Sequence, residues 1–347
     1  MKKLSKERYR FIRRYHQLIL KRKRRRAKRK NESIRRLFPT KIPLSAQRLV
    51  APAAFNIFEP AIRTIFLAFL RELRSFVLLK HQPVLIDFSS TKTMSTGGTL
   101  LFVAELRRII RLTNNKIPIR CLPPRNTKAW QVLEQIGVLE LLKCRKRVIP
   151  TDGDVVHWRF AWGNKVLGEE YDTILQHYDG KLTDGIAKGF YHGLTEAMTN
   201  SRQHAYIEPR QDGLHIFDEP TDWWMFSQEK DDMLTVVFCD LGIGIPATLP
   251  IKKPHLWQKL MTMFGQVTDG QAILEAIADS KSRTGKSYRG KGLKQLLEVI
   301  SASEKGILTV LSNRGCYRYQ SGLEFQQNYK DSILGTLIAW QIPITKL

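Results

Sequence analysis

The first half of the chain alternates between helical and strand patterns. Between Pro60 and Leu79 apolar residues recur every three or four positions, which is typical of an amphipathic helix packed on a core. Proline suits the first helical position because its missing N–H would have no partner there. Strands and further helices are then expected at 84–88, 99–113, 117–122 and from Thr127 onwards. This order predicts a small α/β layer.

The segment before this layer carries a different signal. Residues 39–60 contain four prolines, and an irregular connection is expected there because proline fixes its own φ and lacks a backbone N–H. We therefore expect three parts in an α/β protein: a basic arm with its linker at 1–59, a first domain at 60–150 and a second domain at 151–347.

The second half predicts both helices and a buried strand. A helical stretch begins near Thr183, residues 234–238 (LTVVF) form an apolar run typical of a buried strand, and a glycine pair opens a helix at 290–300. Two neighbouring tryptophans, Trp223 and Trp224, fit either the core side of a hairpin or an exposed contact surface.

Charge is concentrated at the N-terminus. The chain has 57 Lys and Arg against 32 Asp and Glu, a net charge of +25, and residues 1–40 hold 18 basic and 2 acidic residues, a net charge of +16. The polybasic run consists of Lys21, Arg22, Lys23, Arg24, Arg25, Arg26, Lys28, Arg29 and Lys30. Such a run repels itself and favours a polyanion, because each neutralised phosphate releases counterions. Nucleic acid, either DNA or RNA, is the expected partner, with a solubilising tail or a membrane-surface anchor as alternatives.

Cysteine usage and hydropathy favour a cytoplasmic protein. The four cysteines do not form CxxC pairs, so neither a disulfide framework nor a zinc site is expected. The N-terminus has no continuous apolar stretch of the kind that a signal peptide needs. The most apolar segment, 61–79, is interrupted by four charged residues, whereas a membrane span needs about 18 nearly uncharged residues. We expect no transmembrane segment.

Three segments of the α/β layer form a recognisable series. They are LIDFSSTKTMSTGG before a helix, then IPIRCLPP, and then WQVLEQIGVLELL, which has Gly137 between apolar positions. Together, over residues 70–145, they resemble a STAS domain, the fold of bacterial anti-anti-sigma factors. The resemblance implies a domain that contacts a protein partner, with binding of a small ligand as an alternative.

The first-helix turn departs from the regulatory STAS pattern. In that family a phosphorylatable serine lies in an Asp-Ser-Ser-Gly-like turn, whereas residues 94–98 read MSTGG here. By that alignment Ser95 takes the place of the acid and Gly97 the place of the phosphoacceptor. A domain without a phosphorylation switch is therefore expected, and Ser95 or Thr96 as a substitute acceptor is the alternative.

Glu196, Asn200 and His204 are spaced four residues apart in a helical stretch, so they are expected on one helical face. An amide oxygen suits Mg²⁺, which takes few protein ligands and keeps several waters, and a carboxylate can polarise an attacking water. Such a face would suit a metal-bound polyphosphate, although polar triplets also arise by chance. For His204 the alternative is packing at the helix end, near Tyr206.

Two glycine-containing loops follow. The strand at 234–238 runs into Asp240, Gly242 and Gly244, where glycine lets the backbone approach a flat ligand and the acid can accept a hydrogen bond from an exocyclic amine. The second loop opens a helix, whose N-terminal N–H groups suit phosphate. Its candidate phosphate-binding residues are Lys286, Arg289, Gly290, Lys291, Gly292 and Leu293.

The order E-x-x-x-N, D-x-G-x-G, G-x-G-L and a closing strand with Gly335-Thr336 resembles the GHKL ATPase family over about residues 165–345. The E-A-x-x-N-x-x-x-H form of the first motif is closest to the anti-sigma-factor serine kinases. The resemblance implies a GHKL (Bergerat) α/β sandwich that binds ATP and Mg²⁺, with residues 247–289 as a mobile lid.

The resemblance also implies roles for single residues. Glu196 would be the general base and Asn200 the Mg²⁺ ligand. Asp240 would hold the adenine amino group in a pocket lined by Gly242 and Gly244. Thr336 would support Asp240, and Gly290 and Gly292 would bind the phosphates.

Two functions from different classes follow. The first is a Mg-ATP-binding regulatory switch or slow ATPase whose basic arm docks on nucleic acid, in bacterial regulation or anti-phage defence. The alternative is a protein serine/threonine kinase of the anti-sigma type that acts on a STAS-domain partner, and Glu196 fits both because a base can activate water or a hydroxyl. A nucleotide-binding scaffold without turnover is a third reading.

Two other GHKL classes are not expected. In a histidine kinase, phosphoacceptor helices would stand where the STAS-like domain stands, and a gyrase-like enzyme would carry a further domain after the closing strand. GHKL domains often dimerise, so a homodimer is one further expectation.

Overall fold

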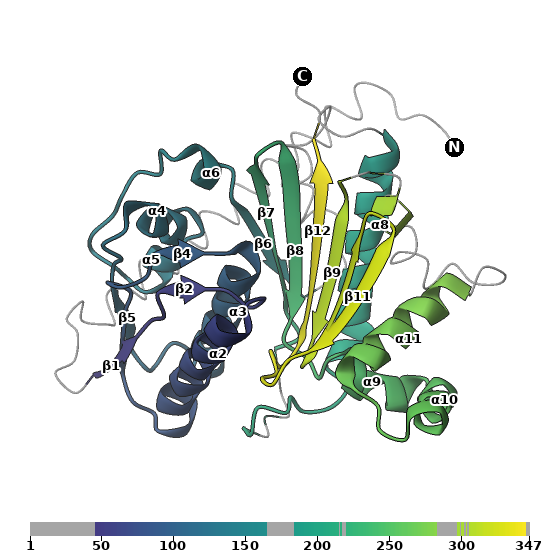
Figure 1. Ribbon diagram of the computed structural model, residues 1–347. Helices are drawn as coiled ribbons and strands as arrows, with labels where there is room; N and C mark the ends of the chain where they lie inside the picture. The colour runs from purple at the N-terminus through teal and green to yellow at the C-terminus, as the bar shows by residue number, and fades with distance from the viewer. Residues whose placement is uncertain are drawn as a thin grey trace, which may run out of the picture. The chain divides into compact units, whose positions relative to one another are not determined.

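The two larger of three sheets divide the described residues into two modules (Figure 1), and the third is a two-stranded sheet of β2 and β4. The computed structural model describes residues 46–164, 184–214, 216, 220–282, 297–298, 300–301, 303 and 305–344. The parallel module, residues 46–156, is built on a parallel sheet, and the antiparallel module, which begins at residue 159, on an antiparallel sheet. Both belong to one compact unit, 44–347. The polybasic run at 21–30 and the candidate phosphate loop at 286–293 lie outside the described residues.

The parallel module confirms the strands and helices expected after Pro60. Its sheet has the order β1-β3-β5, with helices packed against it. A π-helical turn, Ser75–Leu79, extends the first helix to the expected end. The strands are β1 Gln47–Val50, β2 Ala54–Phe55, β3 Val84–Asp87, β4 Thr93–Met94 and β5 Ile119–Leu122, and the helices are α2 Pro60–Arg74, α3 Thr96–Leu112, α4 Thr127–Gln135, α5 Val138–Leu141 and α6 Gly153–Val156.

The expectation of an irregular connection before Pro60 is wrong for two segments. β1 pairs in parallel with β3, and β2 pairs with β4. The pattern of β1 is weak because it is an edge strand in which only Leu49 is buried. The nearest prolines, Pro43 and Pro52, lie outside this strand, so every residue of the strand keeps a backbone N–H for pairing.

The start of α3 is fixed by a close approach between backbones. Ser95 caps the helix: its Oγ accepts a hydrogen bond from Gly98 N at 3.3 Å and donates one to Phe55 O at 2.7 Å. A Cβ atom on Gly98 would lie 2.4 Å from Phe55 O. Position 98 therefore has no room for a side chain.

We expect Gly98→Ala to lower the free energy of unfolding by about 1–3 kcal/mol, because the added methyl meets backbone atoms that cannot move independently. Urea denaturation measures the change. Gly185→Ala is the matched control, since nothing lies within 4 Å of that Cβ position, and the control should be neutral or slightly stabilising. Equal effects in the two variants would contradict the close approach.

The antiparallel module contains a twisted sheet in the order β11-β10-β9-β12-β8-β7-β6. All neighbouring strands in it run antiparallel. Together with the parallel sheet it makes the described chain a mixed α/β fold, as expected. The strands are β6 Arg159–Gly163, β7 Trp223–Lys230, β8 Met233–Asp240, β9 Ile307–Ser312, β10 Gly315–Gln320, β11 Leu323–Asn328 and β12 Thr336–Pro343.

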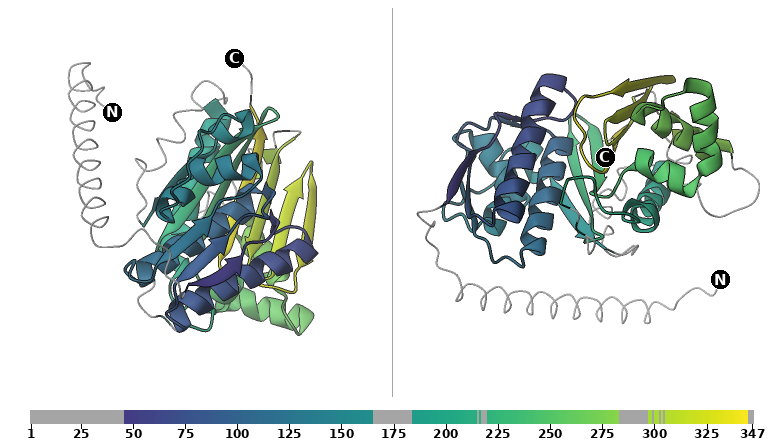
Figure 2. Two further views of the ribbon diagram at one scale, coloured as in Figure 1. Left: turned by 90° about the vertical axis from the view of Figure 1, so that its left-hand side faces the viewer. Right: turned by 90° about the horizontal axis from the view of Figure 1, so that it is seen from below.

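Helices of the same module cover one face of this sheet, and the parallel module covers part of the other (Figures 1 and 2). α3 contacts both β7 and β8. The covering helices are α8 Asp184–Asn200, which continues as the π-helical turn Ser201–Ala205, and α9 Ile245–Lys252 and α11 Asp269–Ser282, while α10 Pro254–Phe264 packs against α9 and α11.

The two neighbouring tryptophans demonstrate that both faces are covered. Trp223 belongs to the core under α8 and α11, whereas Trp224 belongs to the core shared with the parallel module. Each side chain is 1% exposed. Successive strand residues point to opposite faces, so each tryptophan packs in the core on a different face of the sheet. The interpretation of the pair as an exposed contact surface is wrong.

Among the described helices, none is both long enough and apolar enough to cross a bilayer.

Candidate functional site

A row of polar side chains crosses the end of the antiparallel sheet beneath α8. Asp240 on β8 is paired with Thr336 on β12, and Thr336 is paired with Ser312 on β9. Cross-strand partners point to the same face of a sheet, and Phe238, two residues before Asp240, belongs to the core under α8. The hydroxyls of Ser312 and Thr336 lie 3.0 Å apart. A carboxylate and two hydroxyls therefore meet at one edge of this layer.

The Asp240 carboxylate is almost completely enclosed. The residue is 5% exposed, and Gly242 N donates a hydrogen bond to its Oδ1 at 3.1 Å. Burial raises the pKa of Asp240 to about 6, although hydrogen bonds from the backbone of Gly242 and Thr336 and the charge of Arg210 act in the opposite direction. At neutral pH the group is mostly ionised, so a further hydrogen-bond donor from a ligand would stabilise it.

The loop after Asp240 can be built only with glycine at two positions. A Cβ atom on Gly242 would lie 2.1 Å from Ala205 O, and Gly244 has φ +83° with its Cβ position 2.6 Å from Asn313 Nδ2. Asn313 in turn donates to Ile243 O at 2.8 Å. The backbone of this loop is therefore held close to both neighbouring segments, with no side chain in between.

The first and second sequence motifs meet in space. Ile243 N donates to Ala205 O at 2.8 Å, and Thr248 Oγ1 lies 3.3 Å from His204 O. These contacts attach the end of the α8 segment to the loop of Asp240. On α8 itself, Glu196 is half-buried and Asn200 is exposed.

His204 differs from its expected setting in an α-helix, because it lies in the π-helical turn Ser201–Ala205. Its pKa is lowered, first by burial and then by the charges of Lys252 and Lys253. Both effects favour the neutral form of the imidazole.

Most of the expected lid is helical in the described part of the chain. α9, α10 and α11 share a small core that includes Leu249, Leu260 and Ala272. Ile273 and Ile277 of α11 are buried in the core under the sheet. α11 is therefore part of the helical layer, and the rest of the expected lid, 283–289, lies outside the described residues.

The described residues near this edge provide few ligands for a metal ion. Within the described ranges, no group of three or more His, Cys, Asp and Glu side chains could hold a metal ion by itself. The exposed amide of Asn200 provides one neutral oxygen at the end of α8. Mg²⁺ commonly takes one or two protein ligands and completes its octahedron with phosphate oxygens and water.

Several residues of this site were not among the sequence candidates. Ser312 Oγ accepts from Ile245 N at 2.8 Å, and Asn313 Oδ1 accepts from Gly335 N at 3.3 Å. Tyr206 donates to Asp222 O at 2.5 Å and accepts from Leu241 N at 3.1 Å. Only the position of Ser312 and Asn313 at the end of an apolar run could have indicated them from sequence.

A cleft of about 710 Å³ lies on the opposite face of the same sheet. Val237 and Thr309 contribute to its floor, and Phe58 and Gly97 of the parallel module form part of its wall. Val237 and Phe238 point to opposite faces because they are successive residues of β8. The cleft is thus separate from the polar row that includes Asp240.

No protein-family model and no curated protein matches the sequence.

Proposed function

We propose that the antiparallel module is a GHKL-type (Bergerat) ATP-binding domain and that the protein is a Mg-ATP-binding regulatory switch or slow ATPase. In this proposal the parallel module is a STAS-like domain that also contacts a protein partner, and the polybasic run at 21–30 docks the switch on nucleic acid. The main support is Asp240, a buried carboxylate beside Thr336 and a two-glycine loop that touches the α8 segment.

Adenine recognition needs an acceptor for the exocyclic amine and space for a flat ring. Asp240 would accept that hydrogen bond, which is strengthened because the acceptor is charged and enclosed. The backbone between Gly242 and Gly244 would form a wall without side chains. Thr336 and Ser312 would hold the carboxylate end of the pocket in place.

The polyphosphate would extend toward the α8 face that carries Glu196 and Asn200. Asn200 would provide the protein oxygen for Mg²⁺, which neutralises phosphate charge when it is bound. Glu196, which is half-buried one turn earlier on the same helix, would take the proton of an attacking water. The same position would serve a substrate hydroxyl in the kinase alternative.

We expect Glu196→Gln to lower the rate of phosphate release from γ-labelled ATP by about 10²–10⁴-fold, the usual contribution of a general base. The measured products are free phosphate and protein-bound label, and the variant should retain ATP binding because glutamine has the same shape. Label transferred to protein would favour the kinase alternative. Phosphate release unaffected by the substitution would contradict the role of Glu196.

The raised pKa of Asp240 predicts an acid limit for ATP binding. Because the adenine amine needs the ionised carboxylate and the pKa of Asp240 is about 6, affinity for ATP should be constant above pH 7 and about tenfold weaker at pH 5. Calorimetric titration with inosine triphosphate is the control, since it carries the same titrating phosphates and lacks the amine. An ATP-to-inosine-triphosphate affinity ratio that stays constant from pH 5 to pH 8 would contradict the prediction.

A further inference from the structure

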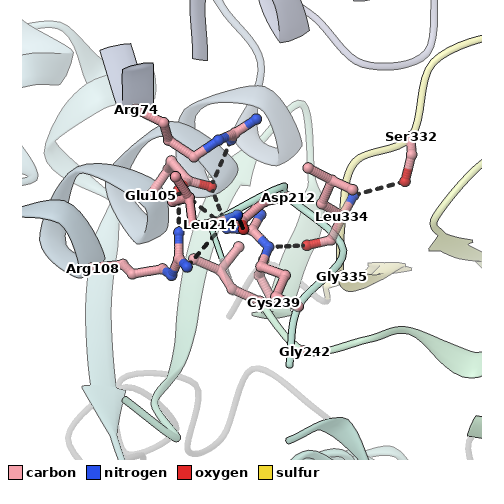
Figure 3. A network of polar contacts seen from close by, with 12 residues as sticks. Arg74, Glu105, Arg108, Asp212, Leu214, Cys239, Gly242, Ser332, Leu334 and Gly335 are labelled. Carbon is pink, nitrogen blue, oxygen red and sulfur yellow. Dashed lines mark hydrogen bonds and ion pairs between the residues drawn. The ribbon is translucent and has the colours of Figure 1, made fainter. Parts of the chain in front are cut away.

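A buried cluster of charges joins the two modules (Figure 3). Glu105 of α3 is fully buried and contacts Arg74 of α2 at 3.1 Å, Arg108 at 3.2 Å and Arg210 at 2.8 Å. Asp212 adds a second carboxylate, 2.8 Å from Arg108. The parallel module supplies the central acid, and the antiparallel module supplies Arg210 and Asp212.

Arg210 also reaches the polypeptide beside Asp240. Its Nε donates to Leu334 O at 2.8 Å, while its Nη1 donates to both oxygens of Glu105. Leu334 has φ +56° and is followed by Gly335, whose Cβ position lies 2.3 Å from Asp240 O. One guanidinium therefore connects Glu105 with the turn that leads into Thr336.

Two further contacts from the parallel module reach the same edge. Arg111 of α3 pairs with Asp222, whose carbonyl accepts the hydrogen bond from Tyr206, and Tyr206 accepts from Leu241 N. Arg63 of α2 donates to Asn313 O at 3.2 Å. The loops on both sides of Asp240 are thus held by residues from α2 and α3.

We propose that Glu105 and Arg210 are positioning residues for recognition of the purine 6-amino group, so that the parallel module completes the nucleotide site of the antiparallel module. The inference rests on the proposed function, because Asp240 must be the group that reads the base. Glu105 acts through Arg210, and Arg210 acts through the Leu334–Gly335 turn on the strand pair that carries Asp240 and Thr336.

The chemistry of arginine makes this connection specific. A guanidinium donates in several fixed directions, so Arg210 can hold a carboxylate and a carbonyl at the same time. Lysine keeps the charge but concentrates its donors at one nitrogen. Arg210→Lys should therefore retain attraction to Glu105 while losing the fixed bond to Leu334 O.

The test compares affinities for ATP and inosine triphosphate, measured by calorimetry in the full chain. For Arg210→Lys we expect ATP affinity to fall about tenfold, within the usual size of coupling between sites, while inosine triphosphate affinity changes less than twofold. Arg107→Lys is the matched control: Arg107 is on α3, the helix of Glu105, but lies over the rings of Phe160 and Trp162, and its substitution should leave the ratio unchanged. Glu105→Asp, which withdraws the carboxylate by one methylene, gives the same comparison if Arg210→Lys does not fold.

The outcomes separate this inference from the proposed function. Unchanged affinities for both nucleotides in Arg210→Lys, with ATP binding intact in the wild type, would overturn the positioning role alone. Equal losses for both nucleotides would also overturn it, because they would indicate general damage to the fold. A wild-type protein that binds neither nucleotide would overturn the proposed function and this inference with it.

Discussion

Replacing Glu105 with glutamine should lower the free energy of unfolding by about 3–5 kcal/mol at pH 7, because removal of one buried ionic partner leaves the others uncompensated. Arg74, Arg108 and Arg210 surround this carboxylate, and each of the three guanidinium groups would lose its ion pair with Glu105. Glutamine fills the same space, so the loss would report charge and hydrogen bonding with little contribution from packing. Urea denaturation is the measurement.

The pH dependence of the free energy of unfolding provides an independent test of the role of Glu105. Burial alone would raise the pKa of Glu105, but the charges of Arg210, Arg74 and Arg108 outweigh it and lower the pKa to about 2. The folded-state pKa lies below the unfolded value, so this stabilisation is fully present above about pH 4.5 and is lost as pH falls toward 2. The stability difference between wild type and Glu105→Gln should therefore shrink over that range.

Glu134→Gln provides the control for this prediction. Glu134 pairs with Arg147, whose side chain is about half exposed, and exposed pairs contribute about 0–1 kcal/mol. A loss in Glu105→Gln no larger than in Glu134→Gln would contradict the account of the buried cluster.

Short sequence patterns correctly predicted several helices, strands and loops. The apolar stripe after Pro60, the run LTVVF and the glycine pair of Asp240–Gly244 all correspond to observed elements. β1 was missed because an edge strand with one buried residue lacks a periodic pattern. The π-helical turn that contains His204 was missed because sequence spacing assumes α-helical geometry.

Non-local partners could not be predicted in the same way. Glu105 and Arg210 are 105 residues apart, and each looks like an ordinary surface charge when it is read in its own segment. The same is true of Asn313, whose role depends on contacts with Ile243 and Gly335. The motifs predicted which residues would face a ligand, whereas the residues that hold those motifs in place became visible only in three dimensions.

Replacing Asp240 with asparagine should weaken ATP binding by at least about 100-fold, which corresponds to roughly 2.7 kcal/mol. Gly242 N would keep its acceptor if the amide oxygen took the place of Oδ1. The amide NH₂ group would then face the adenine amine, so two donors would oppose each other in an enclosed pocket. An unsatisfied buried donor of this kind is costly.

The same substitution should stabilise the protein without ligand. The pKa of Asp240 is raised to about 6, above the unfolded value near 4, so its ionised form opposes folding once the pH exceeds this range. Asparagine carries no charge, and we expect a gain of about 1–3 kcal/mol in the free energy of unfolding at pH 7. Weaker binding combined with higher stability would exclude unfolding as the cause of the lost affinity.

Calorimetric titration of Mg·ATP into the wild type and Asp240→Asn at pH 7.5 tests the central claim most directly. We expect one ATP bound per wild-type chain and at least about 100-fold weaker binding by the variant. A wild-type protein that does not bind ATP, or equal affinities in the two proteins, would contradict the assignment of Asp240 as the residue that recognises adenine.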